Sequence, residues 1–386
     1  MAVIVCNISA LEYWRCPPIV RDAEVPLGVA CAPRDAGGLG FARSTFFPRT
    51  NAREAERLIP GRLLTDLKGV SLPVHVMVDG TARRSSTELI AYHRMPATVS
   101  RENIIQLGNG LSVLSPLAAL VDASQKQIRT HIARVACECC GIYACHRDTL
   151  RSNFVLNELL ATHELERIAR QARRSLSDYL ESKNDPPWIP SLANTTRSAS
   201  LWRRPPLFSK DELQSFTIAN SSLRGSKPLY RALDLVQDGL ASPLETQSLI
   251  MACSDSASGG QGLPVPEINK RIPLSNEARK LYPFSNVYAD GLWENNKTIF
   301  EANGKAFHAD DKGFLIQSGR TSALKLMGYK IHELNYAQLK DPDQFAAIMK
   351  TLAEDIGATP PRRTAAFLAR ESKLRFETLQ RTPFTN

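Results

Sequence analysis

Short stretches in which apolar and polar residues alternate predict β-strands in both halves of the chain. They cover residues 74–78 and 111–114 in the first half, and residues 268–272, 286–293, 297–302 and 329–334 in the second. Successive side chains of a strand point to opposite faces of a sheet, so this alternation is typical of strands that bury one face. We therefore expect sheet structure in both halves.

Capping signals and helical spacing predict helices between these strands. Ser115-Pro116 and Ser242-Pro243 each place a hydroxyl at the N-cap and a proline at the first helical position. Residues 321–327 predict a helix that ends at Gly328, because glycine tolerates the left-handed conformation of a C-cap. A last amphipathic helix covers residues 342–356. We predict an α/β N-terminal part and an α+β C-terminal part with a mixed sheet flanked by helices.

The length of the chain favours two domains. Of its 386 residues, 43% are hydrophobic and 23% charged, as in globular proteins with buried cores. We expect an N-terminal domain at residues 1–185 and a second domain at residues 225–357. Residues 186–224 are rich in Pro, Ser, Asn and Arg and predict a linker, with short helices as interruptions, because prolines oppose regular structure. Residues 358–386 form a basic C-terminal tail.

The excess of basic residues indicates an anionic partner. Lys and Arg number 48 against 39 Asp and Glu, which gives a formal net charge of +9. Nucleic acid is the commonest anionic partner, although many basic proteins bind none. The chain has neither a secretory signal pattern nor a stretch as long as a membrane span. With eight cysteines and no export signal, we expect reduced thiols in a cytoplasmic protein that contacts no membrane.

A cysteine-rich segment leaves two interpretations open. Cys137 and Cys140 have the Cys-x-x-Cys spacing that forms half of a structural zinc site. The other half would come from Cys145 and His146, which are adjacent, and a chelate from neighbouring residues is strained. Buried thiols without metal are the favoured interpretation.

Two acidic residues on consecutive predicted strands indicate a metal site. Asp290 and Glu301 have a spacing that fits a hairpin, and converging carboxylates suit Mg²⁺ or Mn²⁺, since hard cations take carboxylate oxygens plus water. The alternative is a hairpin with ordinary surface carboxylates. His308 follows Glu301 and has a pKa suited to proton transfer, with a hydrogen-bonded surface histidine as the alternative.

Several short motifs follow one another in the C-terminal half. They are Ser242-Pro243-Leu244-Glu245, Gly262-Leu263-Pro264 with Asn269, Asp290-x-x-Trp293, Glu301-x-Asn303-Gly304, His308, and Arg320 with Gly328-Tyr329. In this order they resemble the Vsr-like endonuclease domain of the restriction-endonuclease, or PD-(D/E)XK, superfold over residues 225–357. The resemblance implies a restriction-endonuclease-like mixed sheet and the hydrolysis of DNA phosphodiesters with Mg²⁺ or Mn²⁺. RNA is the alternative substrate.

The resemblance also implies a role for each motif residue. Asp290 and Glu301 hold the metal, and Glu245 approaches the site from the preceding helix. His308 acts near the scissile phosphate. Lys305 is a candidate to stabilise the pentavalent phosphate.

Two of the candidate residues have structural alternatives. Glu245 stands where a capping box with Ser242 would place it, and this role can coexist with one in the site. Arg320 either clamps a phosphate or pairs with a local carboxylate such as Glu333, and we favour the structural pair.

The chain departs from the family pattern at two positions. Family members commonly have an acid where this chain has Asn303, and another where it has Gln317, three residues before Arg320. The signature lysine would also fall at position 303, two residues before Lys305. A second hypothesis is therefore a degenerate domain that binds nucleic acid, or regulates, without cutting.

The N-terminal half resembles the AbiEi-type antitoxin proteins that carry such a domain in actinobacterial genomes. The matching pieces are residues 9–15, 74–78, 93–94, 113–116 and 138–143. This resemblance implies a setting in toxin–antitoxin systems, phage defence or mobile elements. A third hypothesis is a protein-interaction module whose basic tail docks an acidic partner protein. The oligomeric state is not indicated by the sequence.

Overall fold

The computed structural model of the chain describes residues 3–23, 67–78, 86, 88–96, 99–108, 111–170, 188–191, 200–303 and 311–380. These residues divide between two compact units. The first unit falls within Met1–Gln127 and Tyr143–Arg231, and the second within Ile128–Ile142 and Ala232–Pro383. Mixed α/β structure is present, as expected. No helix in these ranges has the length and apolarity needed to cross a bilayer.

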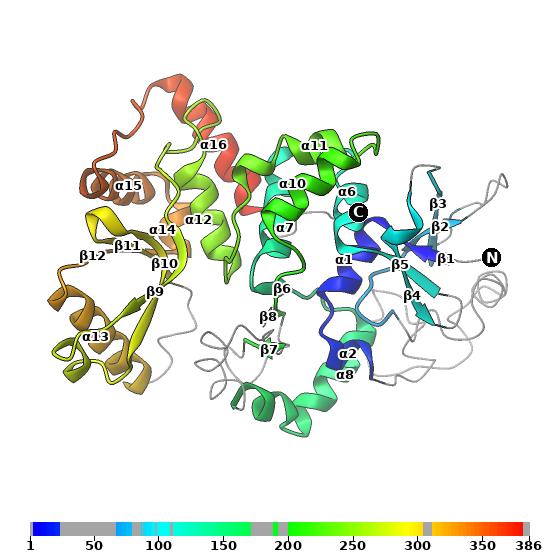
Figure 1. The fold of residues 1–386 in the computed structure, drawn as a ribbon, viewed down its shortest axis with the longest axis horizontal. Helices are drawn as coiled ribbons and strands as arrows, with labels where there is room; N and C mark the ends of the chain where they lie inside the picture. The colour runs from blue at the N-terminus through cyan, green and yellow to red at the C-terminus, as the bar shows by residue number, and fades with distance from the viewer. Residues whose placement is uncertain are drawn as a thin grey trace. The chain divides into compact units, whose positions relative to one another are not determined.

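The first unit contains a five-stranded mixed sheet with the order β3-β2-β1-β5-β4 (Figure 1). The strands are β1 (Val3–Val5), β2 (Val74–Val78), β3 (Ile90–Arg94), β4 (Ile104–Gly108) and β5 (Leu111–Leu114). β1 runs antiparallel to β2 and parallel to β5. α1 (Asn7–Arg15) and α6 (Pro116–Ala123) pack beside the sheet, and the Ser115 hydroxyl accepts the amide of Ala118 at 3.4 Å. The predicted N-cap is thus confirmed.

The rest of the first unit is helical around a small antiparallel sheet, β6-β8-β7. Its elements are α2 (Pro18–Arg21), the 3₁₀ turn η1 (Arg101–Asn103), β6 (Tyr143–Cys145), α8 (Leu150–Ala161), β7 (Ile189–Pro190), β8 (Leu201–Arg203), α10 (Lys210–Ala219) and α11 (Ser226–Tyr230). Within residues 186–224, expected to be a linker with short helices, the structure describes β7, β8 and α10. Trp202 of β8 is fully buried, and a capping box of Ser209 and Glu212 begins α10. Pro190 lies in β7, and Pro205 and Pro206 follow β8.

The second unit contains the predicted order of helix, strand, hairpin, helix, strand and helix. Its elements are α7 (Arg129–Cys140), η2 (Leu233–Leu235), α12 (Pro243–Cys253), β9 (Glu267–Pro273), η3 (Ala278–Lys280), β10 (Asn286–Trp293), η4 (Glu294–Asn296), β11 (Thr298–Asn303), α13 (Asp311–Leu326), β12 (Lys330–Asn335), α14 (Tyr336–Lys340), α15 (Pro342–Ile356) and α16 (Ala365–Leu379). The sheet order is β12-β11-β10-β9. β9, β10 and β11 are antiparallel neighbours, and β12 runs parallel to β11. The predicted mixed sheet is present.

Helices cover both faces of this sheet. On one face, Ala323 and Leu324 of α13 share a buried cluster with Val287, Ala289 and Ile299 of the strands. α12 and α15 pack against β11 on the other side of the sheet, as Figure 1 shows.

The expected basic tail is in part a helix of the second unit. α16 packs against α7 and α12, and Arg375 is only 7% exposed. Its guanidinium bonds to the carbonyl of Leu339 and lies 3.3 Å from the buried carboxylate of Glu371, which Arg363 also approaches at 3.5 Å. Arg375 is thus used inside the protein, whereas Arg363 approaches Glu371 from an exposed position.

Candidate acidic site on the second sheet

Asp290 lies in β10 where the pairing of the sheet is interrupted on both sides. Toward β11 the paired positions end at Gly291 opposite Phe300. Beyond them, Oδ2 of Asp290 accepts a hydrogen bond of 2.8 Å from the amide of Ala302. Toward β9 the pairing skips Asp290, and the opposite residue, Asn269, has a positive φ of 48°. The sheet therefore opens at Asp290, which reaches the backbone of the next strand through its carboxylate.

Glu301 lies on the neighbouring strand and is buried, with 4% of its surface exposed. It follows Ile299 by two residues, so both side chains point to the face of β11 that α13 covers. On the other side of β11, Glu301 is in register with Glu333 of β12. Glu301 thus stands beside the position where the pairing of β10 ends, and Glu333 is its neighbour on β12.

Arg320 of α13 joins this group. Its Nη2 atom donates to Oε1 of Glu301 at 2.8 Å and to the carbonyl oxygen of Tyr288 at 2.7 Å. The two paired side chains are 15% and 5% exposed. The partner is therefore Glu301 and not Glu333, the example expected from the sequence. Glu333 is exposed.

The electrostatics tie Asp290, Glu301 and Arg320 together. Burial raises the pKa of Glu301 to about 7, Arg320 opposes this effect, and Asp290 and Glu333 add to it. Burial alone would lower the pKa of Arg320, but Glu301 and Asp290 raise it above its ordinary value. Both carboxylates therefore act on the same guanidinium, and Glu301 changes its charge near neutral pH.

Glu245 serves the start of α12. Its Oε2 atom accepts a hydrogen bond of 2.8 Å from the amide of Ala241, and its own amide donates to the hydroxyl of Ser242 at 3.2 Å. This differs from the predicted capping box by one residue, because the carboxylate takes the amide before the N-cap. The carboxylate is buried at 6% exposure. Its expected approach to the site of Asp290 and Glu301 stays a prediction.

Two candidate residues, Lys305 and His308, lie outside the described residues, and their roles stay predictions. The two positions that depart from the family pattern are described. Asn303 ends β11 opposite Asn335 and is half-buried, and Gln317 lies one turn before Arg320 on α13. Neither supplies a carboxylate to the site.

The sequence predicts a site for Mg²⁺ or Mn²⁺, and the described side chains show which ligands are available. In the parts of the chain that the structure describes, no group of three or more His, Cys, Asp or Glu side chains is arranged to hold a metal ion. Asp290 and Glu301 alone fit a cation such as Mg²⁺, which commonly uses one or two carboxylates and completes its shell with water and phosphate oxygens. Such a cation would share Glu301 with Arg320.

The cysteine-rich segment is buried. Cys137, Cys139 and Cys140 of α7 are each at most 2% exposed and form no disulfide. The thiol of Cys137 donates to the carbonyl of Leu235 at 3.6 Å and accepts from the amide of Gln237 at 3.4 Å. The burial expected of these thiols is confirmed.

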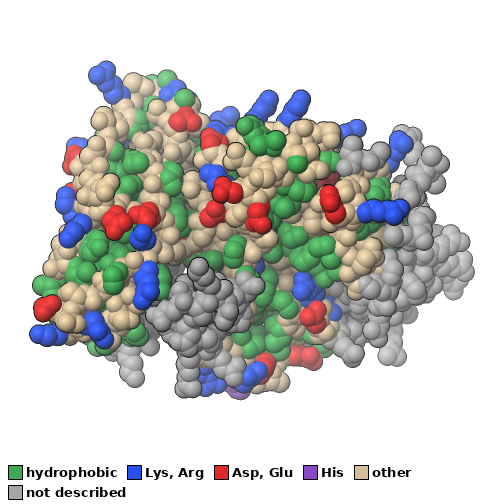
Figure 2. All heavy atoms as spheres, in the orientation of Figure 1, with side chains coloured by type: hydrophobic (Ala, Val, Ile, Leu, Met, Phe, Trp, Pro, Cys, Tyr) green, Lys and Arg blue, Asp and Glu red, His purple; other side chains and the backbone are tan. Residues whose placement is uncertain are grey.

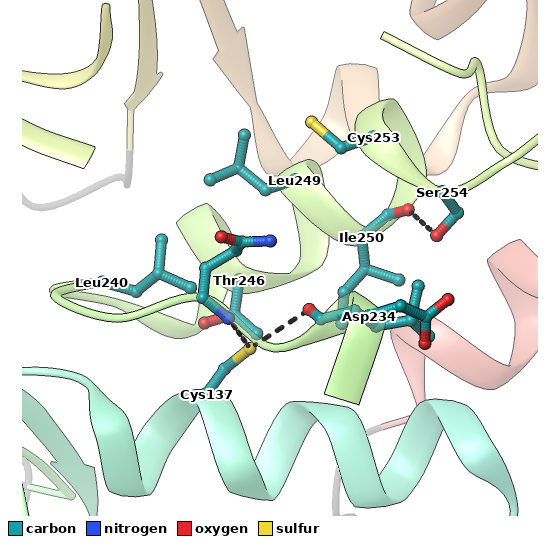
Figure 3. Close-up of a pocket in the computed structure, with 10 residues that line it drawn as sticks. Cys137, Asp234, Leu240, Thr246, Leu249, Ile250, Cys253 and Ser254 are labelled. Carbon is teal, nitrogen blue, oxygen red and sulfur yellow. Dashed lines mark hydrogen bonds between the residues drawn. The ribbon is translucent and has the colours of Figure 1, made fainter. Parts of the chain in front are cut away.

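A pocket with about 290 Å³ of empty space, part of it open solvent, lies beside Cys137 (Figure 3). Its lining includes Leu235, Leu240, Thr246, Leu249, Ile250 and Ser254. Figure 3 shows Cys137 and Ser254 engaged in hydrogen bonds with neighbouring backbone, and the remaining side chains are mostly apolar. Neither Asp290 nor Glu301 lines it, so it is not a substrate site for the acidic pair.

The loop between β9 and β10 carries aromatic and basic residues to which the sequence pattern assigned no role. The rings of Tyr282 and Phe284 are 4.8 Å apart. Burial raises the pKa of Tyr282, and Arg320 opposes this effect, so the loop lies within electrostatic reach of the acidic site. Arg279 and Lys280 directly precede Leu281 and these aromatics, and this run is the signal in the sequence that could have found them.

Comparison with known proteins gives no relative for this chain. No family model, no curated protein and no solved structure matches it.

Proposed function

We propose that the second unit is a metal-dependent endonuclease-like domain that hydrolyses DNA phosphodiesters at Asp290 and Glu301. The observation that carries the proposal is the convergence of these two carboxylates, from neighbouring strands, on the guanidinium of Arg320. An ordinary exposed hairpin would leave both acids in water. Glu301 is buried at the point where the sheet opens, and buried titratable groups of this kind are typical of functional sites.

Each residue of the site has a role in this proposal. Asp290 and Glu301 would hold Mg²⁺ or Mn²⁺, which when bound neutralises charge on a phosphate and lowers the pKa of a bound water. Arg320 orients Glu301 through its 2.8 Å bond and adds a positive charge beside the phosphate. Glu301 has a pKa of about 7 and gives up its proton in the neutral range, where it becomes a ligand.

Plasmid cleavage tests the proposal. Purified full-length protein is incubated with supercoiled plasmid and Mg²⁺ or Mn²⁺, with Asp290→Asn and Glu301→Gln as variants. Glu294→Gln, an exposed acid in the same hairpin, is the matched control. We expect nicking by the wild type and by the control, and none by the two site variants. Cleavage by Asp290→Asn at the wild-type rate would remove the proposed site.

A second candidate function is favoured by the ion pair itself. Arg320 already neutralises Glu301, and Asn303 and Gln317 supply no further carboxylate. A degenerate domain that binds nucleic acid and regulates, in the manner of a toxin–antitoxin component, would keep these features. It predicts salt-sensitive DNA binding, because released counterions drive such association, with no cleavage at any Mg²⁺ or Mn²⁺ concentration.

The wider setting is part of the proposal. A cytoplasmic role in phage defence or mobile-element biology would follow from either function. Fractionation of cells that express the tagged protein should recover it in the cytoplasm.

A further inference from the structure

The loop at residues 274–285 is packed against α13, on the same side of the sheet as the acidic site. Ala278 of η3 is fully buried in the cluster that contains Leu324 of α13. A Cβ atom added to Gly319 would stand 2.5 Å from the carbonyl oxygen of Leu281, so the helix and loop backbones are in direct contact. These contacts with α13 fix the position of the loop in the second unit.

Two large apolar side chains of this loop remain exposed. Phe284 is 52% exposed and Leu281 is 47% exposed. The ring of Phe284 lies 4.8 Å from that of Tyr282 at an angle of 49°, and Tyr282 is half-buried. The half-buried ring of Tyr282 supports the ring of Phe284, and much of the Phe284 side chain stays accessible. A supported aromatic ring is a surface on which a flat ligand can stack.

Positive charge accompanies these apolar residues. Arg279 and Lys280 are exposed in η3, and Glu277 is the only acid in residues 274–285, so the loop is net positive. Figure 2 shows acidic and basic side chains interspersed over the visible face. A ligand at this loop would therefore meet the positive charge of Arg279 and Lys280 themselves. The carbonyl oxygen of Leu281 meets α13 at Gly319, the residue before Arg320, so the loop lies next to the residue that pairs with Glu301.

We propose that residues 279–284 bind an unpaired stretch of nucleic acid, with a base stacked on Phe284 and flanking phosphates against Arg279 and Lys280. Aromatic rings next to cations are the means by which proteins hold single strands without reading sequence. A duplex offers no free base face, so a preference for unpaired nucleotides follows. This inference rests on the proposed function and adds the class of substrate to it.

Binding is measured by fluorescence anisotropy with the full-length protein in EDTA. The probes are a labelled oligothymidine strand and a labelled duplex of the same length. Phe284→Ala should weaken strand binding by about 5- to 150-fold, since stacking contributes roughly 1–3 kcal/mol per base. Duplex binding should change little. Phe376→Ala is the matched control, because Phe376 is 69% exposed on α16 of the same unit.

The charged residues have a separate readout. Replacing both Arg279 and Lys280 by Ala should flatten the dependence of log affinity on log salt by about 1.4, since each phosphate contact to a single strand contributes about 0.7. Lys350→Ala with Lys373→Ala, two exposed lysines elsewhere in the unit, should leave the slope unchanged. Circular dichroism confirms that each variant is folded.

Equal strand affinity of Phe284→Ala and Phe376→Ala would overturn the inference. Failure of the wild type to bind the strand at low salt would also overturn it. The exposed apolar residues of the loop would then favour a protein partner. The two proposals fail separately. Loss of strand affinity in Phe284→Ala, with no cleavage by the wild type, would refute hydrolysis and retain the strand-binding surface.

Discussion

Glu301→Gln is expected to change the pH dependence of stability in a direction that the burial of this carboxyl determines. In the folded protein the pKa of Glu301 is about 7, against an ordinary value of 4.5. The unfolded chain therefore releases this proton near pH 4.5, whereas the folded protein holds it until about pH 7. Stability contributed by the group is fully present below pH 4.5 and is lost as the pH rises to 7.

The magnitude follows from the same values. The difference between 4.5 and about 7 corresponds to roughly 3 kcal/mol, at about 1.36 kcal/mol for each pH unit. Glutamine keeps an oxygen acceptor for Arg320 and does not titrate. The free energy of unfolding of the variant, minus that of the wild type, should thus rise by about 2–3 kcal/mol between pH 5 and pH 8.

Urea unfolding at several pH values checks this expectation, with amide hydrogen exchange in β10 and β11 to report on the second unit. Glu294→Gln is the control, because its carboxylate is exposed. A difference that stays constant with pH would refute the reasoning, since Glu301 would then titrate alike in both states. A difference that falls with pH would mean that the ion pair with Arg320 outweighs burial.

Three further substitutions test the packing of the fold, each by urea unfolding. Arg375→Ala should destabilise the second unit by about 3–5 kcal/mol, because it leaves the buried Glu371 without its closest cation, whereas the exposed Lys373→Ala should cost less than about 0.5 kcal/mol. Gly328→Ala should cost about 1 kcal/mol, because φ is +83° at this helix end although nothing lies within 4 Å of the added Cβ. Gly225→Ala should cost more than Gly328→Ala, because the added methyl group would overlap the carbonyl oxygen of Val121. Similar small losses in all three would show that these contacts do not hold the fold.

Local patterns predicted the strands of the second unit well. β10 and β12 begin and end within a residue of the expected positions, because each alternates and is bounded by turn residues. The helix expected at residues 321–327 begins ten residues earlier, at Asp311. Gly319 interrupts the pattern of this helix, and only the approach of the Leu281 carbonyl explains why glycine is needed there.

Long-range contacts were beyond the reach of these patterns. The charge of residues 358–386 suggested a basic tail, whereas Arg375 and Glu371 form an ion pair inside the unit. The spacing along the chain identified the candidate acids Asp290 and Glu301. For Arg320, however, the sequence suggested Glu333 as an example of a partner. Which carboxylate it meets depends on the face of β11 that α13 covers, and spacing along the chain does not determine this.

Binding of Mn²⁺, followed by electron paramagnetic resonance, tests the central claim most directly. We predict that Asp290 and Glu301 hold one ion together, with an affinity that rises as the pH approaches 7 and Glu301 loses its proton. Asp290→Asn and Glu301→Gln should each abolish this binding, and Glu294→Gln should not. An Mn²⁺ affinity equal in the wild type and in both site variants would contradict the account.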